Sequence, residues 1–197
     1  MNYLAHSFLS FKEPHYLVGN YLGDFVRNKE MDQFPDPIQR GIKLHREIDA
    51  YTDVHPQVKL STRLLHAAMH KYAPVVIDIY FDYLLSKHWQ KYTEQSLISF
   101  CARTYEILEE HKKIMPERIQ NRLIRMLKGR WLENYQTYPD LEKTFYFLSR
   151  RAKFSSRLEE APAILQGLES KIENHFNAFF PEAIQFVQKK ISEMEKY

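Results

Sequence analysis

The stretch 74–85, Pro-Val-Val-Ile-Asp-Ile-Tyr-Phe-Asp-Tyr-Leu-Leu, indicates the kind of fold that this chain adopts. Proline is favoured at the start of a helix, where its missing N–H would have no partner. The apolar residues that follow then give an approximate helical stripe. Asp78 and Asp82 lie four residues apart in a helix that is otherwise apolar enough to be internal. Two carboxylates held together inside a protein require a cation or a shared proton.

Prolines elsewhere predict further helices. Pro56, Pro116, Pro162 and Pro181 also stand where a helix could begin, and apolar residues recur at spacings of three and four behind Pro181. Helices are predicted near 2–10, 15–28, 36–52, 56–71, 74–90, 94–113, 116–133, 140–151 and 158–195, the last broken at Pro181.

The composition supports one all-α domain. Only 5 of the 197 residues are Gly, too few for a fold rich in tight turns. No run of Gly and Ser marks a linker, so residues 1–197 are predicted to form a single helical bundle. Residues that can bind a metal are concentrated in 1–90.

Several function classes find no support in the sequence. A net charge of +3 is too small to indicate nucleic-acid binding, and no window approaches the roughly 18 apolar residues of a membrane span. The single cysteine, Cys101, cannot form an internal disulfide, so a cytoplasmic location is expected. The motifs of serine hydrolases, P-loop proteins and zincins are missing.

Imidazoles and carboxylates recur on the helices of the first half. His45 and Asp49 lie four residues apart and share a helix face, and Asp24 follows an apolar segment. Any such pair can arise by chance, and His6 taken alone is more typical of a hydrogen-bonded core histidine. Together with Asp78 and Asp82, however, these residues favour a mixed nitrogen and oxygen site for Mn²⁺, Mg²⁺, Fe or Zn²⁺.

Four motifs in this order and spacing resemble the acyl carrier protein phosphodiesterases. They are Met1-Asn2-Tyr3-Leu4-Ala5-His6, Gly19-Asn20-x-x-x-Asp24-Phe25-Val26, Gly41-Ile42-x-Leu44-His45-Arg46-x-Ile48-Asp49-x-x-Thr52-Asp53-x-His55-Pro56 and Ala73-Pro74-x-x-x-Asp78-x-x-Phe81-Asp82-x-x-Leu85-x-x-His88-Trp89. The match is dense over residues 1–90 and rests on length and helicity beyond them.

The resemblance implies an all-α fold similar to an atypical branch of the HD-domain phosphohydrolases, with Mn²⁺ favoured and Mg²⁺ possible. It implies hydrolysis of the phosphodiester that joins 4′-phosphopantetheine to a serine of holo acyl carrier protein. The chain has no adjacent His-Asp dipeptide, so it departs from the HD signature itself. The ligands assigned on this basis are Asp24, His45, Asp49 and Asp82, with His6 and Asp78 as ligands or as supports for ligands.

Three further residues acquire expected roles from the implied reaction. Arg46 could clamp a phosphoryl oxygen through two hydrogen bonds, or form an ordinary salt bridge. His55 or His88 could protonate the departing serine oxygen, although His88 could also simply close a helix end.

A basic segment in the second half predicts where the carrier protein docks. Between His111 and Arg130 there are seven basic residues and one acidic residue, and Arg118, Arg122 and Arg125 share one helix face. Acyl carrier proteins are strongly acidic, so residues 111–157 are a possible docking region. The alternative is a solvated face balanced by acids elsewhere. Two other functions stay open: an HD-type phosphohydrolase of nucleotides or small phosphate esters, and a non-catalytic helical binding module.

Overall fold

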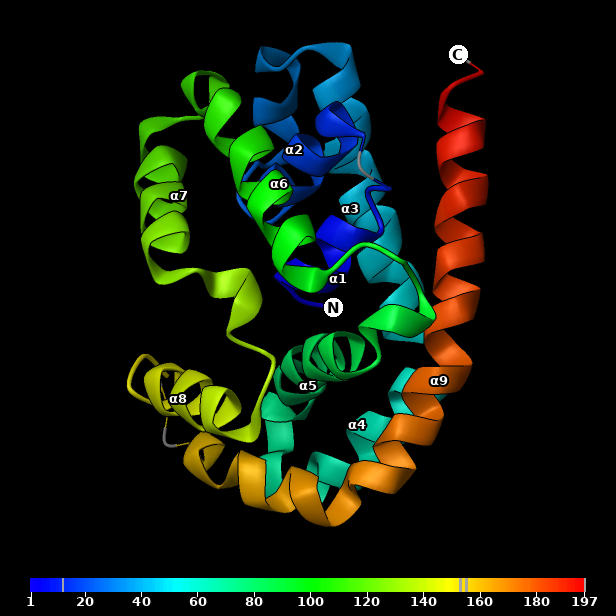
Figure 1. Ribbon diagram of the computed structural model, residues 1–197, viewed down its shortest axis with the longest axis vertical. Coiled ribbons are helices and arrows are strands. Elements are labelled where there is room, and N and C mark those ends of the chain that lie inside the picture. The colour runs from blue at the N-terminus through cyan, green and yellow to red at the C-terminus, as the bar shows by residue number, and fades with distance from the viewer. Residues whose placement is uncertain (12, 153, 155, 197) are drawn as a thin grey trace.

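The computed structural model describes residues 1–11, 13–152, 154 and 156–196, and over these residues the chain is helical and contains no strand (Figure 1). The all-α prediction is therefore confirmed. The α-helices are α1 (Tyr3–Phe8), α2 (Pro14–Gly23), α3 (Asp36–Val54), α4 (Pro56–Met69), α5 (Ala73–Lys87), α6 (Leu97–Glu110), α7 (Glu117–Gly129), α8 (Tyr138–Ser149) and α9 (Ala161–Met194). The short 3-10 turns between them are η1 (Asn28–Gln33), η2 (His70–Tyr72), η3 (Trp89–Lys91), η4 (Lys112–Ile114), η5 (Trp131–Glu133) and η6 (Leu158–Glu160).

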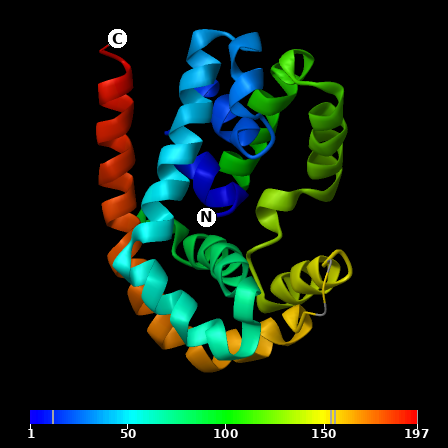
Figure 2. The same cartoon turned by 180° about the vertical axis from the view of Figure 1, so that it is seen from behind.

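The helices are arranged around α1, which lies near the centre of the molecule with α2, α3 and α6 about it (Figure 1). Helix α9 runs along the end of the molecule where α4 and α8 lie, and then continues along one side (Figure 1). From behind, α3 and α4 are seen to run beside α9 (Figure 2), and α9 contacts both of them as well as α5 and α8. The shortest helix of the bundle is thus enclosed by the others.

Aromatic side chains fill the core between α5 and α9. Phe81 of α5 is fully buried, and its ring lies 5.3 Å from that of Phe176 and 5.6 Å from that of Phe179. Phe180 packs against Phe8 of α1, with ring centroids 5.8 Å apart. Burying such rings removes large apolar areas from water, which fixes α1 and α5 against α9.

The predicted break at Pro181 is wrong, because α9 continues through this residue. A proline inside a helix removes one backbone hydrogen bond and bends the helix. Helix α9 is visibly curved around its neighbours (Figure 1), and the buried rings of Phe179 and Phe180 precede the proline directly. Their packing offsets the lost hydrogen bond, so the chain stays helical.

Two other predicted helices end earlier than expected. Helix α2 stops at Gly23 and the chain forms η1 instead of continuing to residue 28. Helix α7 stops at Gly129, because Arg130 adopts a left-handed backbone conformation with φ of 46°. In both cases a short 3-10 turn, η1 or η5, follows the earlier end of the helix.

Two glycines let α2 and α3 cross closely. A Cβ atom on Gly19 would lie 2.3 Å from the Ile38 carbonyl oxygen and 2.6 Å from the Gly41 Cα. A Cβ atom on Gly41 would equally lie 2.8 Å from the Gly19 Cα. Since no larger residue fits at either position, these glycines set how near α2 approaches α3.

Over the part of the chain that the structure describes, no helix combines the length and the apolar character that a membrane crossing requires.

Candidate metal centre

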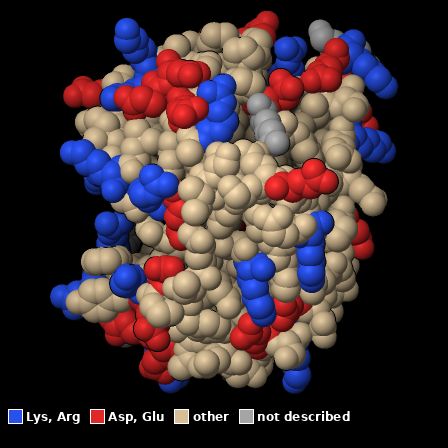
Figure 3. Space-filling model, in the orientation of Figure 1, with Lys and Arg blue, Asp and Glu red and all other residues tan. Residues whose placement is uncertain are grey.

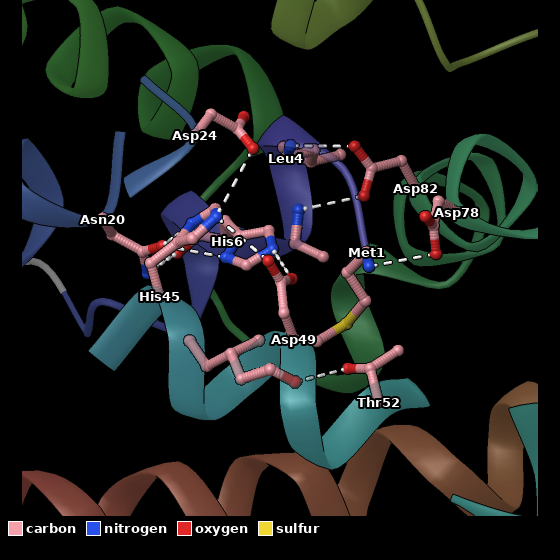
Figure 4. A network of polar contacts seen from close by, with 12 residues as sticks. Met1, Leu4, His6, Asn20, Asp24, His45, Asp49, Thr52, Asp78 and Asp82 are labelled. Atoms are coloured by element: carbon pink, nitrogen blue, oxygen red, sulfur yellow. Dashed lines mark hydrogen bonds and ion pairs between the residues drawn. The ribbon is translucent and has the colours of Figure 1, made fainter. Parts of the chain in front are cut away.

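Four side chains from three parts of the chain converge beside α1 (Figure 4). His45 Nε2 lies 3.1 Å from Asp49 Oδ2 and 3.4 Å from Asp24 Oδ1, and His6 Nε2 lies 3.0 Å from Asp49 Oδ1. His6 belongs to α1, His45 and Asp49 belong to α3, and Asp24 follows α2. We call these four residues the His/Asp cluster. The two histidines are buried, whereas nearly half of each carboxylate side chain is exposed.

Asn20 orients both imidazoles of the cluster. Its Oδ1 atom lies 2.8 Å from His6 Nδ1 and 2.9 Å from His45 Nδ1. Its amide nitrogen donates to the His6 carbonyl oxygen and to Ser10 Oγ, which fixes Oδ1 as the atom that faces the rings. Both Nδ1 atoms therefore carry hydrogen, and both Nε2 atoms point to Asp49.

Local geometry brings the rings together. His45 and Asp49 lie one helical turn apart on α3 and so share a face. The ring of His6 stacks on that of His45, with centroids 4.2 Å apart. A Cβ atom on Gly23 would lie 2.3 Å from the His45 ring, so the end of α2 can accommodate the imidazole only because this residue is glycine.

The cluster holds one positive charge between two negative ones. Burial opposes the charge on His45, but hydrogen bonds with Asp24 and Asp49 outweigh it and raise the pKa of His45 to about 9. Burial also opposes ionisation of both carboxyls, yet their bonds to His45 hold the pKa of Asp24 and the pKa of Asp49 below the ordinary range. Burial, assisted by the charge on His45, lowers the pKa of His6. With its Nδ1 donating to Asn20, a neutral His6 ring turns the lone pair of Nε2 toward the Asp49 carboxylate, an unfavourable contact that a bound cation would relieve.

The donor set fits a divalent cation. One ligand atom from each of His6, His45 and Asp49 can be chosen so that all three lie within 4.8 Å of one another. Asp24 adds a carboxylate oxygen 3.4 Å from His45 Nε2. Two imidazole nitrogens with fixed tautomers and one or two carboxylates suit Mn²⁺, Fe or Zn²⁺ better than an ion that prefers thiolates. Displacing the proton on His45 would give such an ion a complete set of lone pairs.

The structure places Asp82 at the N-terminus of α1, outside the cluster. Its two carboxylate oxygens accept hydrogen bonds from the backbone N–H of Leu4, at 2.8 Å, and of Ala5, at 3.1 Å. These N–H groups have no partner within the helix, and the side chain of Asn2 does not cap them. Burial raises the pKa of Asp82 to about 7, although both backbone N–H groups favour the carboxylate. Asp82 therefore holds the helix that carries His6.

Asp78 lies one turn before Asp82 on α5 and contacts the first residue of the chain. Its Oδ1 atom lies 3.0 Å from the amino group of Met1. Figure 4 shows both aspartates of α5 directed at the chain that leads into α1. Asp82, which was expected as a ligand, and Asp78, which was expected as a ligand or a support, are thus both bonded to the N-terminal segment.

Arg46 contacts the segment that follows Asp24. Its guanidinium donates to the Val26 carbonyl oxygen at 2.9 Å and to Asn28 Oδ1, and it lies 3.3 Å from the sulfur of Met31. These contacts hold the turn η1 against α3. These contacts account for the direction of the Arg46 side chain without a phosphoryl clamp and without the alternative salt bridge.

His55 and His88 both bond to glutamates of α9. His55 Nε2 lies 3.1 Å from Glu182 Oε2, and its Nδ1 accepts from the backbone N–H of Gln57 at the start of α4. At the end of α5, His88 Nε2 bonds to Glu173 of α9. The structure therefore connects these two histidines to α9 and does not join them to the His/Asp cluster by a hydrogen bond within the described residues.

The three arginines of α7 differ in their surroundings. Arg118 and Arg125 are exposed, whereas Arg122 is only partly exposed. Arg118 donates to the Phe25 carbonyl oxygen at 2.8 Å, and Arg122 donates to the Tyr3 hydroxyl at 2.7 Å. The face that carries them is therefore packed in part against the segment beside Asp24.

Sequence reasoning did not identify Asn20 and Ser10 as parts of the site. Asn20 is 1% exposed and Ser10 is fully buried, so both are polar residues inside the core. A signal for Asn20 was present, because an amide in the apolar helix α2, four residues before Asp24, requires partners. Nothing local pointed to Ser10.

Comparisons with known proteins identify the family of this chain. The profile of the family described as acyl carrier protein phosphodiesterase matches residues 1–183. A protein of that name from Serratia proteamaculans is 29% identical over 191 residues, which cover 96% of this chain and 99% of the relative. One from Pectobacterium atrosepticum is 31% identical, covering 91% of this chain and 90% of the relative. One from Photorhabdus laumondii is 30% identical, covering 100% and 98%.

No solved structure matches the chain, so the expected likeness to the HD-domain fold stays a prediction. The family match covers most of the length and includes all four residues of the His/Asp cluster as well as Asn20. The chain therefore belongs to the acyl carrier protein phosphodiesterase family.

Proposed function

We propose that this protein is a metal-dependent phosphodiesterase that removes 4′-phosphopantetheine from the serine of holo acyl carrier protein and releases the apo carrier protein. The relatives, which are acyl carrier protein phosphodiesterases by name, support this substrate. The observation that carries the chemistry is the pair of imidazole Nε2 atoms that Asn20 turns toward Asp49.

The residues of the His/Asp cluster bind the cation, with Mn²⁺ favoured and Mg²⁺ as an alternative. A divalent ion held there supplies Lewis acidity, which favours ionisation of an attacking water and offsets the charge of phosphoryl oxygens. His6 and His45 provide nitrogen donors whose direction Asn20 fixes, and Asp49 provides an oxygen donor between them. Asp24 is the more distant ligand candidate, and its partly exposed carboxylate marks the side of the cluster that faces solvent.

Residues on α7 support docking of an acidic carrier protein. Lys and Arg side chains gather on the side of the surface formed by α7 (Figure 3), where Arg118 and Arg125 are exposed. Because Arg118 also bonds to the carbonyl oxygen of Phe25, the residue after Asp24, this basic face begins beside the cluster. Complementary charge would then guide the carrier protein to the metal centre.

The test is incubation of holo carrier protein with this protein and Mn²⁺, followed by intact-mass measurement. We expect the carrier to lose the mass of phosphopantetheine, and EDTA to prevent the loss. His45→Ala and Asp49→Ala should each abolish most turnover with the circular dichroism still helical, whereas the exposed His66→Ala should behave like the unaltered protein. Undiminished turnover in EDTA and in both cluster variants would show that the proposed mechanism is wrong.

The same experiment separates the competing functions. An HD-type hydrolase of small esters would cleave a generic phosphodiester and leave the holo carrier intact. A binding module would retain the carrier without changing its mass. Either result would refute the carrier-protein phosphodiesterase.

A further inference from the structure

Two buried polar atoms near the His/Asp cluster have no hydrogen-bond partner within the described part of the chain. They are the Nε atom of Arg122 and the hydroxyl oxygen of Tyr21. Buried donors are nearly always paired in folded proteins, so each unpaired one requires an explanation. Both atoms belong to side chains that surround Tyr3, which suggests one explanation for both.

Arg122 lies in an aromatic cage. Its guanidinium carbon is 5.0 Å from the ring centre of Phe25, 5.3 Å from that of Trp131 and 5.8 Å from that of Tyr3. It donates one hydrogen bond, to the Tyr3 hydroxyl, and forms no ion pair with any described residue. Cation–π contacts hold the guanidinium in place but leave most of its five N–H donors available.

Tyr21 packs against two rings of this cage. Its ring centre is 6.4 Å from that of Tyr3 and 5.6 Å from that of Phe25. Tyr21 lies three positions before Asp24 at the end of α2, while Tyr3 is one turn before His6 on α1. The helices that supply the cluster thus also supply the side chains about the two unpaired donors.

We propose that Arg122 and Tyr21 form an anion subsite that binds a phosphoryl oxygen of the substrate beside the metal centre. Arg122, which has no counter-ion among the described residues, and Tyr21, whose hydroxyl has no partner there, pack against the same two rings, those of Tyr3 and Phe25. Their donors complement the negative charge and acceptor oxygens of a phosphodiester. Arg122 is partly exposed, so an anion can approach its free N–H groups, and the hydroxyl hydrogen of Tyr21 can turn about its C–O bond toward the bound group. This inference rests on the proposed function, because it supplies a binding group for that reaction.

Tyr21→Phe gives the sharpest test, since it removes only the hydroxyl and keeps the ring. The probe is inorganic phosphate, whose binding to the Mg²⁺-loaded protein is followed by ³¹P NMR line broadening. We expect Tyr21→Phe and Arg122→Gln to weaken phosphate binding about tenfold each. Lys128→Gln, an equal loss of charge at an exposed position of α7, should leave it unchanged. The variants should bind Mg²⁺ as the unaltered protein does.

Stability distinguishes a subsite from a structural role. If the Tyr21 hydroxyl only fills space, Tyr21→Phe will leave phosphate affinity unchanged, and that result overturns the proposal. A subsite predicts weaker phosphate binding in a variant whose thermal midpoint is equal or higher, because the removed group had no partner. Arg122→Lys, which keeps the charge but lacks the planar fork, should restore phosphate affinity only in part.

The two hypotheses can fail separately. Loss of phosphate binding in Tyr21→Phe, together with an intact holo carrier protein, would refute the proposed function and keep the anion subsite. If both variants hydrolyse the holo carrier with unchanged KM and bind phosphate with unchanged affinity, the anion subsite is refuted and the proposed function is kept.

Discussion

Metal uptake by the His/Asp cluster is predicted to expel one proton at neutral pH. The proton resides on His45, whose pKa is raised to about 9 by Asp24 and Asp49 in spite of burial. The lowered pKa values of Asp24 and Asp49 favour ionised carboxylates, and burial lowers the pKa of His6, which disfavours a second proton on that ring. A metal ion requires the lone pair of His45 Nε2, so ion and proton compete for the same atom.

The size of this effect follows from the pKa of His45. At pH 7 a group with a pKa of about 9 is protonated in about 99 of 100 molecules. Removing that proton costs about 2.7 kcal/mol, or about a hundredfold in apparent metal affinity. The affinity should therefore rise about tenfold for each pH unit between 6.5 and 8.5.

Isothermal titration calorimetry with Mn²⁺ under argon measures both quantities. Titrations at pH 7 in buffers of different ionisation enthalpy give the number of protons released, which we expect to be close to one. Asp24→Asn should weaken the pH dependence, because it removes one of the two partners that raise the pKa of His45. The exposed His66→Gln should leave it unchanged. Release of no proton, with an affinity that stays flat over the same pH range, would refute the assignment of the charge to His45.

Three other perturbations test the supports of the site. Asn20→Leu should destabilise the protein by about 2–4 kcal/mol in urea unfolding, because two buried imidazole N–H groups lose their acceptor. An unchanged midpoint would contradict the tautomers assigned here. Gly23→Ala should displace the His45 ring and lower the Mn²⁺ affinity at least tenfold in calorimetry. Its control is Gly167→Ala, whose added Cβ meets nothing within 4 Å. This control should keep the Mn²⁺ affinity and raise the free energy of unfolding by about 0.5–1 kcal/mol. Asp82→Ala should cost about 2–4 kcal/mol of unfolding free energy and speed hydrogen exchange in α1, since two buried N–H groups lose their partner; slow exchange there would show that α1 does not depend on Asp82.

Much of the fold was predictable because helix formation depends on residues that are close together in the sequence. Pro56 begins α4, and Pro74 and Pro162 lie in the first turns of α5 and α9, where proline costs no hydrogen bond. The wrong prediction of a helix break at Pro181 also came from local sequence alone. Sequence reasoning weighs the lost hydrogen bond, but the burial of Phe179 and Phe180 that offsets it exists only after α9 has packed against α1 and α5.

The candidate site divides in the same way. The sequence by itself determined that His45 and Asp49 share a helix face, because a spacing of four is a property of the helix alone. Only the tertiary structure decided that His6 and Asp24 join them, that Asn20 orients both rings, and that Asp82 holds α1. These residues are far apart along the chain, and they meet because Gly19 and Gly41 let α2 and α3 cross closely and because the core fixes α1 between its neighbours. Helical periodicity orders residues over one or two turns, whereas the packing of buried surfaces determines which turns face one another.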